Sequence, residues 1–135
     1  MTPPLMILIA GPYRSGTGDD PVLLRRNLSR LEEAAWPLFR AGHLPVIGEW
    51  VALPVLASAG ASGLQDPLSA EVMYPTAQRL LQHCNGVLRL PGASAGADAD
   101  VALATDLGLP VYTRLEDVPG VAAAAAAAAA AVGSA

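Results

Sequence analysis

The sequence predicts an α/β domain in which a parallel sheet of about four to five strands lies between two layers of helices. Residues 5–10 form a continuous apolar run with turn signals on both sides, which is typical of a central strand covered on both faces. Strand-like and helix-like segments then alternate along the chain, as expected for parallel βαβ units. A loop of small residues at 91–96 runs straight into one of the predicted helices. Together these features favour a Rossmann-like or flavodoxin-like three-layer αβα sandwich.

Asp20 followed by Pro21 marks the start of the first predicted helix, with the aspartate as N-cap and the proline in the first turn. Apolar residues then recur at helical spacing, and Gly42 is expected to end the helix. Pro37 lies inside this segment and removes one backbone hydrogen bond, so we expect a kink there. Residues 43–47 are predicted to form the second strand.

The segment from residue 48 to 69 has the weakest pattern in the sequence. Residues 48–50 are expected to leave the second strand at the edge of the sheet where ligands bind. Residues 57–63 are predicted to form a mobile loop, and long loops of this kind often act as lids or binding segments. A helix is predicted over about residues 69–83, with Pro75 near its first turns.

Residues 86–90 are predicted to form the third strand. The helix after the small-residue loop is expected to end at Gly108, and residues 108–112 to form the fourth strand. We expect one domain over residues 1–119 and an alanine-rich tail over 120–135, which contains ten consecutive alanines. Alanine favours helix, but a helix of this length is marginal alone in water, so the tail should be either docked or frayed. No function is assigned to it.

The composition excludes several classes of function. The net charge is −4 and the eight basic residues are arginines scattered along the chain, so no basic stripe is available for a nucleic-acid polymer. The absence of lysine rules out Schiff-base chemistry and a phosphate-binding loop ending in Gly-Lys-Ser/Thr. Cys84, His43 and His83 are too few and too dispersed to suggest a metal site, and no cofactor is indicated. We therefore expect a small-molecule ligand.

The apolar run near the amino terminus is too short to span a membrane, and no basic region precedes it. The sequence therefore predicts a cytoplasmic protein with no membrane association.

Candidate ligand-binding residues follow three of the predicted strands, whose carboxyl ends meet at one edge of a parallel sheet. Tyr13 could stack on a base and Glu49 could bind sugar hydroxyls, although a packed aromatic and an exposed acid fit the sequence equally well. Ser94 with the helix start could bind an anion, aided by Arg14, or could simply cap the helix. The predicted substrate-binding set is Gly11, Pro12, Tyr13, Arg14, Glu49, Ser94, Gly96 and Asp98.

Two aspartates begin the helix that follows the small-residue loop. Asp98 and Asp100 are two residues apart and so point about 200° apart around the helix, which means that only one of them can face a ligand. A carboxylate at this place could stabilise or attack the anomeric carbon of a sugar during glycosidic cleavage. The alternative for both is to complement the helix dipole. Tyr74 and Glu71, near the start of the preceding helix, are weaker candidates.

Three short motifs occur in order along the chain. They are Ala10-Gly11-Pro12-Tyr13 after the first strand, Asn85-Gly86-Val87 at the third, and Ser94-x-Gly96-Ala97-x-x-Asp100-x-Ala102-x-Ala104 after it. With these motifs, over roughly residues 5–113, the chain resembles the nucleoside 2-deoxyribosyltransferase-like superfamily, which includes the 2′-deoxynucleoside 5′-phosphate N-hydrolases.

The resemblance implies a nucleoside or nucleotide ligand and chemistry at its N-glycosidic bond. It places the carboxylate nucleophile, usually a glutamate, on Asp100 and the phosphate-contacting serine on Ser94, with Tyr13 and Arg14 beside the sugar and the base. It also implies a homo-oligomer, by default a dimer. On this basis we expect an N-glycosidase or a deoxyribosyltransferase.

This sequence departs from the superfamily at three positions. Asp100 is one methylene shorter than glutamate, which withdraws the carboxylate by about 1 to 1.5 Å, and a misplacement on this scale can slow a reaction strongly. Asn85 stands where aspartate is common, and Ala77 stands at the position of a supporting aspartate. The alternative expectation is therefore a non-catalytic nucleotide-binding or sensor protein that keeps the pocket but has lost the catalytic acids.

Overall fold

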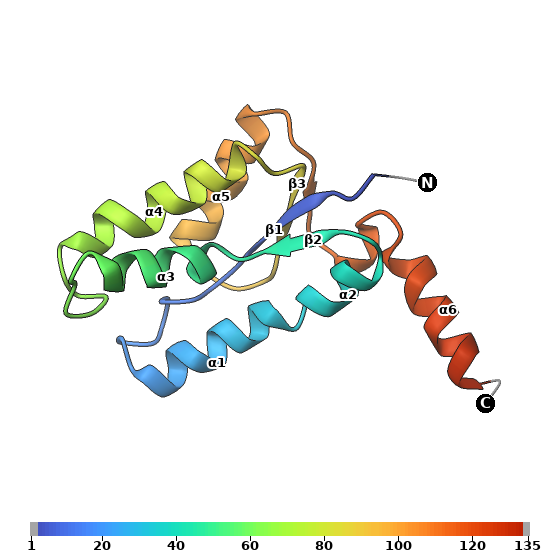
Figure 1. Cartoon of the computed structure of the whole chain (residues 1–135), viewed down its shortest axis with the longest axis horizontal. Helices are drawn as coiled ribbons and strands as arrows, with labels where there is room; N and C mark the ends of the chain where they lie inside the picture. The colour runs from blue at the N-terminus through green and yellow to red at the C-terminus, as the bar shows by residue number, and fades with distance from the viewer. Residues whose placement is uncertain (1–2, 134–135) are drawn as a thin grey trace.

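A four-stranded, all-parallel sheet forms the centre of the structure, a computed structural model that describes residues 3–133 (Figure 1). The strands lie side by side in the order β2-β1-β3-β4. Their bounds are β1 Met6–Ala10, β2 Leu44–Val46, β3 Gly86–Arg89 and β4 Val111–Tyr112. With helices on both faces of this sheet, the predicted α/β class and the Rossmann-like or flavodoxin-like three-layer sandwich are confirmed.

The central strand β1 is buried on both faces because its apolar run contributes side chains to two separate cores. Ile7 and Ile9 pack in one core and Leu8 and Ala10 in the other, as the alternation of side chains along a strand requires. All four are at most 3% exposed. Strand β1 pairs with β2 on one side and β3 on the other, so it anchors the whole sheet.

The helices divide between the two faces. Leu31 of α1, Leu38 of α2 and Val121 of α6 lie in the core with Ile7, whereas Leu81 of α4 lies in the opposite core. Figure 1 shows α3 running alongside α4 on this second face. The helical bounds are α1 Pro21–Glu32, α2 Ala35–Arg40, α3 Gly48–Ser58, α4 Leu68–Leu81, α5 Ala95–Asp106, η1 Leu115–Asp117 and α6 Val121–Gly133.

The first predicted helix starts as expected but is broken rather than kinked. Asp20 caps α1 by accepting a 2.9 Å hydrogen bond from the backbone N–H of Val22. The helix ends at Glu32, and α2 begins three residues later, at Ala35, with Pro37 in its first turn. Proline is tolerated in a first turn because an N–H there has no helical partner, so the chain stops one helix and starts another.

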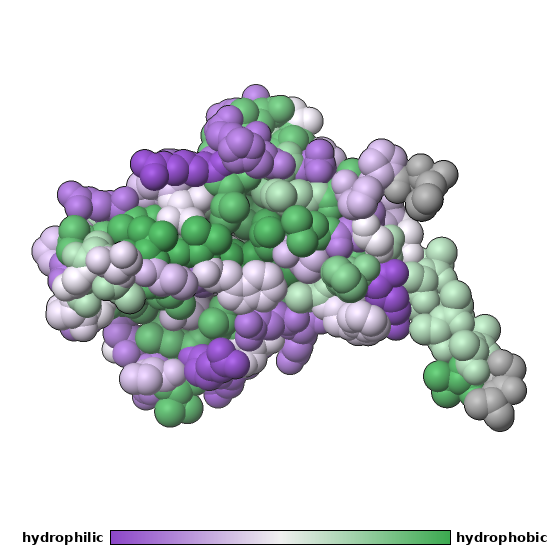
Figure 2. Space-filling model, in the orientation of Figure 1, coloured by the Kyte–Doolittle hydropathy of each residue, from purple (hydrophilic) through white to green (hydrophobic). Residues whose placement is uncertain are grey.

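Residues 48–50 lie at the ligand edge of the sheet as expected, but they begin a helix that the sequence did not predict, α3, which runs to Ser58 and includes the first residues of the predicted loop. This helix has little apolar periodicity: Ala52 and Leu56 are buried, but Val51 and Val55 are 44% and 46% exposed. Figure 2 shows the resulting apolar surface, in green, along this part of the molecule. The loop that separates α3 from α4 covers residues 59–67 only.

The alanine-rich segment forms the helix α6. Its first residue, Val121, is 4% exposed and packs in the core beneath α1 and α2, while most of the following alanines are exposed. Figure 1 shows the rest of α6 projecting away from the sheet. Within residues 3–133, no helix combines the length and the apolar character needed to cross a membrane.

His43 links three distant parts of the chain. Its Nδ1 accepts a 3.1 Å hydrogen bond from the backbone N–H of Leu5, and its Nε2 lies 2.6 Å from the backbone oxygen of Pro119. The ring is 6% exposed, so both backbone groups depend on it for a partner. The neutral ring with its proton on Nε2 satisfies both contacts.

We expect His43→Ala to lower the free energy of unfolding by about 2 to 4 kcal/mol, because two backbone groups lose their partner and a buried side chain is removed. Urea unfolding followed by circular dichroism measures the change. His83 is exposed, and His83→Ala should change the free energy of unfolding by less than about 0.5 kcal/mol. Equal effects of the two substitutions would contradict the structural role of His43.

Candidate functional site

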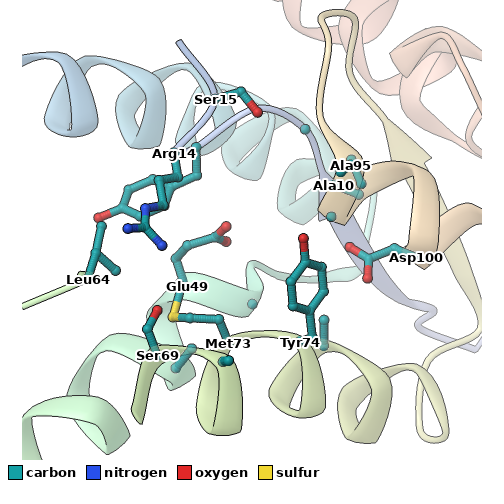
Figure 3. Close-up of a pocket in the computed structure, with 18 of the residues that line it drawn as sticks. Ala10, Arg14, Ser15, Glu49, Leu64, Ser69, Met73, Tyr74, Ala95 and Asp100 are labelled. Carbon is teal, nitrogen blue, oxygen red and sulfur yellow. The ribbon is translucent and has the colours of Figure 1, made fainter. Parts of the chain in front are cut away.

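A cavity of about 520 Å³ opens at the carboxyl ends of the central strands. The chain leaves β1 and β3 in different directions at this edge, because β1 leads to α1 on one face and β3 leads to α5 on the other. Such a switch in the direction of the connections creates a crevice in parallel α/β sheets. The walls come from the loop after β1, the starts of α3 and α5, and one side of α4 (Figure 3).

The structure brings most of the predicted site residues together. The cavity lining includes six of them, contributed by three segments of the chain: Gly11, Tyr13, Arg14, Glu49, Gly96 and Asp100. Pro12, Ser94 and Asp98 do not line the cavity. The fold thus brings together residues that lie up to about ninety positions apart in the sequence.

Ser94 and Asp98 have structural partners outside the cavity. The Ser94 hydroxyl caps α5 by accepting a 3.1 Å hydrogen bond from the backbone N–H of Ala97. The Asp98 side chain is 74% exposed and forms a 2.9 Å ion pair with Arg89. Pro12 packs on the other side of its loop, where a Cβ on Gly92 would lie 2.6 Å from the Pro12 ring. The capping interpretation therefore describes Ser94, and Asp98 faces solvent.

Asp100 points into the cavity from the second turn of α5 (Figure 3). The pKa of its carboxyl is raised to about 7, mainly by burial and also by the nearby charge of Glu49, while Arg89 acts in the opposite direction. As the helical period predicts, the two aspartates point in different directions: Asp100 lines the cavity and Asp98 is exposed to solvent. A carboxyl that titrates near neutral pH is common in catalytic sites.

Glu49 lies in the first turn of α3, not in a loop, and its carboxyl points into the same cavity (Figure 3). Burial raises the pKa of Glu49 as well. The charge of Glu49 in turn raises the pKa of Asp100, so the two carboxyls are electrostatically linked. Near neutral pH, the Asp100 carboxyl therefore holds a proton for part of the time.

Arg14 forms a two-point ion pair with Asp19. The distances are 2.6 Å from Nε to Oδ1 and 2.9 Å from Nη2 to Oδ2. Asp19 adopts a left-handed backbone conformation, with φ of 60°, and its N–H donates to the Thr17 hydroxyl. The sequence prediction missed Asp19, although an acid five residues after an arginine in a glycine-rich loop is a recognisable signal.

Two tyrosines border the carboxyl pair. Tyr13 lines the cavity from the loop after β1, and its pKa is raised by burial and by the charges of Glu49 and Asp19. Figure 3 shows the Tyr74 hydroxyl pointing between the carboxyls of Glu49 and Asp100. The Tyr74 ring lies close to the start of α5, where a Cβ on Gly96 would be 3.5 Å from it. Tyr74, a weaker candidate in the sequence, thus belongs to the site, whereas Glu71 is exposed and does not line it.

The two remaining departures from the superfamily pattern have different positions. The Asn85 side chain accepts a 2.8 Å hydrogen bond from the N–H of Met6, at the amino ends of β3 and β1 and so far from the cavity edge. Ala77 does line the cavity, and it packs near Gly48. Asn85 therefore stabilises the pairing of β1 and β3, whereas Ala77 forms part of the cavity wall.

Comparisons of this chain with family models, curated proteins and solved structures found no match. Within residues 3–133, no cluster of three or more histidine, cysteine, aspartate or glutamate side chains is arranged to hold a metal ion. The site is therefore defined by its own geometry, namely two partly buried carboxyls, two tyrosines and an arginine that is already paired.

We expect Asp100→Asn to stabilise the protein at pH 8. The pKa of Asp100 rises from an ordinary 3.8 to about 7 on folding, so the folded state binds the proton more tightly and stability falls as the pH rises between these values. The variant cannot ionise and avoids this loss, which amounts to about 2 kcal/mol after allowance for solvent screening. Urea unfolding at pH 3 to 8 measures it; the two proteins should converge near pH 3.

Asp98→Asn is the matched control. It changes the same charge on the same helix but removes a surface ion pair, so it should leave stability at pH 8 unchanged or slightly lower. A variant Asp100→Asn that is less stable than the unmodified protein at pH 8 would contradict the buried, partly protonated state of Asp100.

Proposed function

We propose that the protein cleaves the N-glycosidic bond of a nucleoside-type substrate, as a hydrolase or as a deoxyribosyltransferase, with Asp100 as nucleophile. The observation that carries the proposal is the pair of carboxyls, Glu49 and Asp100, that face one cavity at the carboxyl edge of the sheet. The motif resemblance that places a nucleophile at Asp100 supports the same assignment.

Glycosidic cleavage suits an acidic cavity because positive charge develops on the sugar in the transition state. In the proposed first step, an Asp100 oxygen forms a bond to the anomeric carbon while the bond from that carbon to the base nitrogen breaks. The bonding electron pair leaves with the base, which takes up a proton. In the second step, water or another base attacks the same carbon and releases Asp100. A cavity rich in carboxylates stabilises the cationic transition state more than the neutral substrate.

Glu49 is the proposed source of the proton. In the proposed reactive form, Asp100 is ionised and Glu49 carries a proton, which passes to the departing base. Because the pKa of Asp100 is the one raised to about 7, this is the less populated of the two singly protonated forms. The Tyr74 hydroxyl points between the two carboxyls (Figure 3), and its proposed role is to donate a hydrogen bond to the ionised one during the reaction. Tyr13 and Tyr74 together provide aromatic surface for the base.

The defining assay follows release of free base from a panel of 2′-deoxynucleosides and their 5′-monophosphates, with and without a second base as acceptor. We expect turnover by the unmodified protein and a loss of at least about 100-fold in Asp100→Asn, because the nucleophile is removed. Asp98→Asn should retain most of the activity, since its side chain lies outside the cavity. Release no faster than in Asp100→Asn, for every substrate, would refute the enzymatic proposal.

The pH dependence of turnover tests the role of Glu49. If the singly protonated pair is the active form, kcat/KM should fall as the pH rises above about 7, where the pair loses its last proton. In Glu49→Gln this falling limb should disappear and the maximum rate should drop, because the neighbouring charge and the shared proton are both gone. A falling limb that persists unchanged in Glu49→Gln would show that Glu49 does not share the proton.

A second candidate is a non-catalytic nucleotide-binding or sensor protein. The aliphatic Ala77 in the cavity lining favours it, since this position offers no third carboxyl to orient a nucleophile. Thermal-shift screening separates the two candidates: ligand-dependent stabilisation without base release would support binding alone.

A further inference from the structure

We propose that the cavity selects an unphosphorylated nucleoside over its 5′-monophosphate, and that the Arg14–Asp19 ion pair sets this selectivity. The inference rests on the proposed function for its ligand class, and it replaces the sequence-based expectation of a phosphate site at Ser94 and Arg14. It follows from the charges that the structure places on and around the cavity.

Acidic side chains dominate the charged lining. Of the charged residues within 3–133, Glu49, Asp66 and Asp100 line the cavity together with one basic residue, Arg14. The pKa of Asp66 is lowered by hydrogen bonds from the backbone N–H groups of Leu68 and Ser62, so this carboxylate is ionised at neutral pH. Asp66 therefore contributes a full negative charge. The carboxyls of Glu49 and Asp100 add further negative charge.

The one basic residue of the lining is neutralised by its neighbour. Asp19 engages Arg14 through both carboxylate oxygens, at 2.6 and 2.9 Å, in the planar geometry that an arginine would otherwise offer to a phosphate. The loop fixes this arrangement, because the Thr17 hydroxyl donates to the Arg14 carbonyl oxygen at 2.6 Å and accepts from the Asp19 N–H at 3.2 Å. The edge of Arg14 that binds anions best is thus already occupied.

Two other positively polarised groups near the cavity are engaged as well. The Arg89 guanidinium donates to the carbonyl oxygens of Leu90 and Gly92 and to Asp98, and Arg89 does not line the cavity. At the start of α5, the N–H of Ala97 is taken by the Ser94 hydroxyl. The Arg14–Asp19 pair has no net charge, so the lining is net negative near neutral pH because of Asp66 and the carboxyls of Glu49 and Asp100.

Such a cavity repels a phosphate group, which carries up to about two negative charges of its own at neutral pH. It accepts a neutral nucleoside without this penalty and favours the cationic transition state of glycosidic cleavage. Asp19 is therefore a specificity-determining residue that acts through Arg14.

The test measures binding, by isothermal titration calorimetry at low salt, of the four common 2′-deoxynucleosides and their 5′-monophosphates. The proteins are the unmodified chain, Asp19→Asn and Asp106→Asn. Asparagine tolerates the left-handed backbone of position 19, so the loop should be retained, and circular dichroism checks the fold. Asp106 ends α5 and does not line the cavity, so its substitution matches the change in net charge.

We expect the unmodified protein to bind its best nucleoside at least about tenfold more tightly than the corresponding monophosphate. Asp19→Asn should tighten monophosphate binding about tenfold with little change for the nucleoside, because Arg14 is released, and Asp106→Asn should leave the ratio unchanged. Tighter binding of the monophosphate by the unmodified protein, an unchanged ratio in Asp19→Asn, or binding of none of these ligands would overturn the inference. Selective nucleoside binding without release of base would instead refute only the proposed catalysis.

Discussion

The burial of β1 on both faces is the constraint on which the rest of the structure depends. Ile7 and Ile9 complete one core and Leu8 and Ala10 the other, so the connections on either side of this strand must cover opposite faces of the sheet. That requirement separates the chain leaving β1 from the chain leaving β3 and opens the crevice between them. The site is thus a consequence of the sheet topology.

The same topology explains why two carboxyls occupy partly buried positions. Glu49 and Asp100 are each held in an early turn of a helix that starts at the carboxyl edge of the sheet, so both side chains are directed into the crevice. Each carboxyl alone would ionise readily in water, but burial raises the pKa of both, and the charge of Glu49 helps to raise that of Asp100 to about 7. Holding these carboxyls in partly buried positions lowers the stability of the fold at a pH where they are ionised.

The sequence predicted the parts of this structure that depend on local signals. The apolar run of β1 and the Asp20 cap each follow from a few adjacent residues, and the structure confirms them. For Ser94, which the sequence assigns to substrate binding with capping as the alternative, the structure shows the cap. Helix α3 was missed because its apolar residues lie on all sides and Pro54 interrupts it. The contributions of Tyr74 and Asp66 depend on how α3 and α4 pack together, which no local pattern encodes.

The central claim, that Asp100 attacks the sugar, is tested most directly by intact-protein mass spectrometry after rapid acid quench of the protein with a 2′-deoxynucleoside. The account predicts a mass increase of one deoxyribosyl group, located on the peptide that contains Asp100 and absent in Asp100→Asn. Release of base with no covalent adduct under any quench condition, or an adduct on another residue, would contradict it.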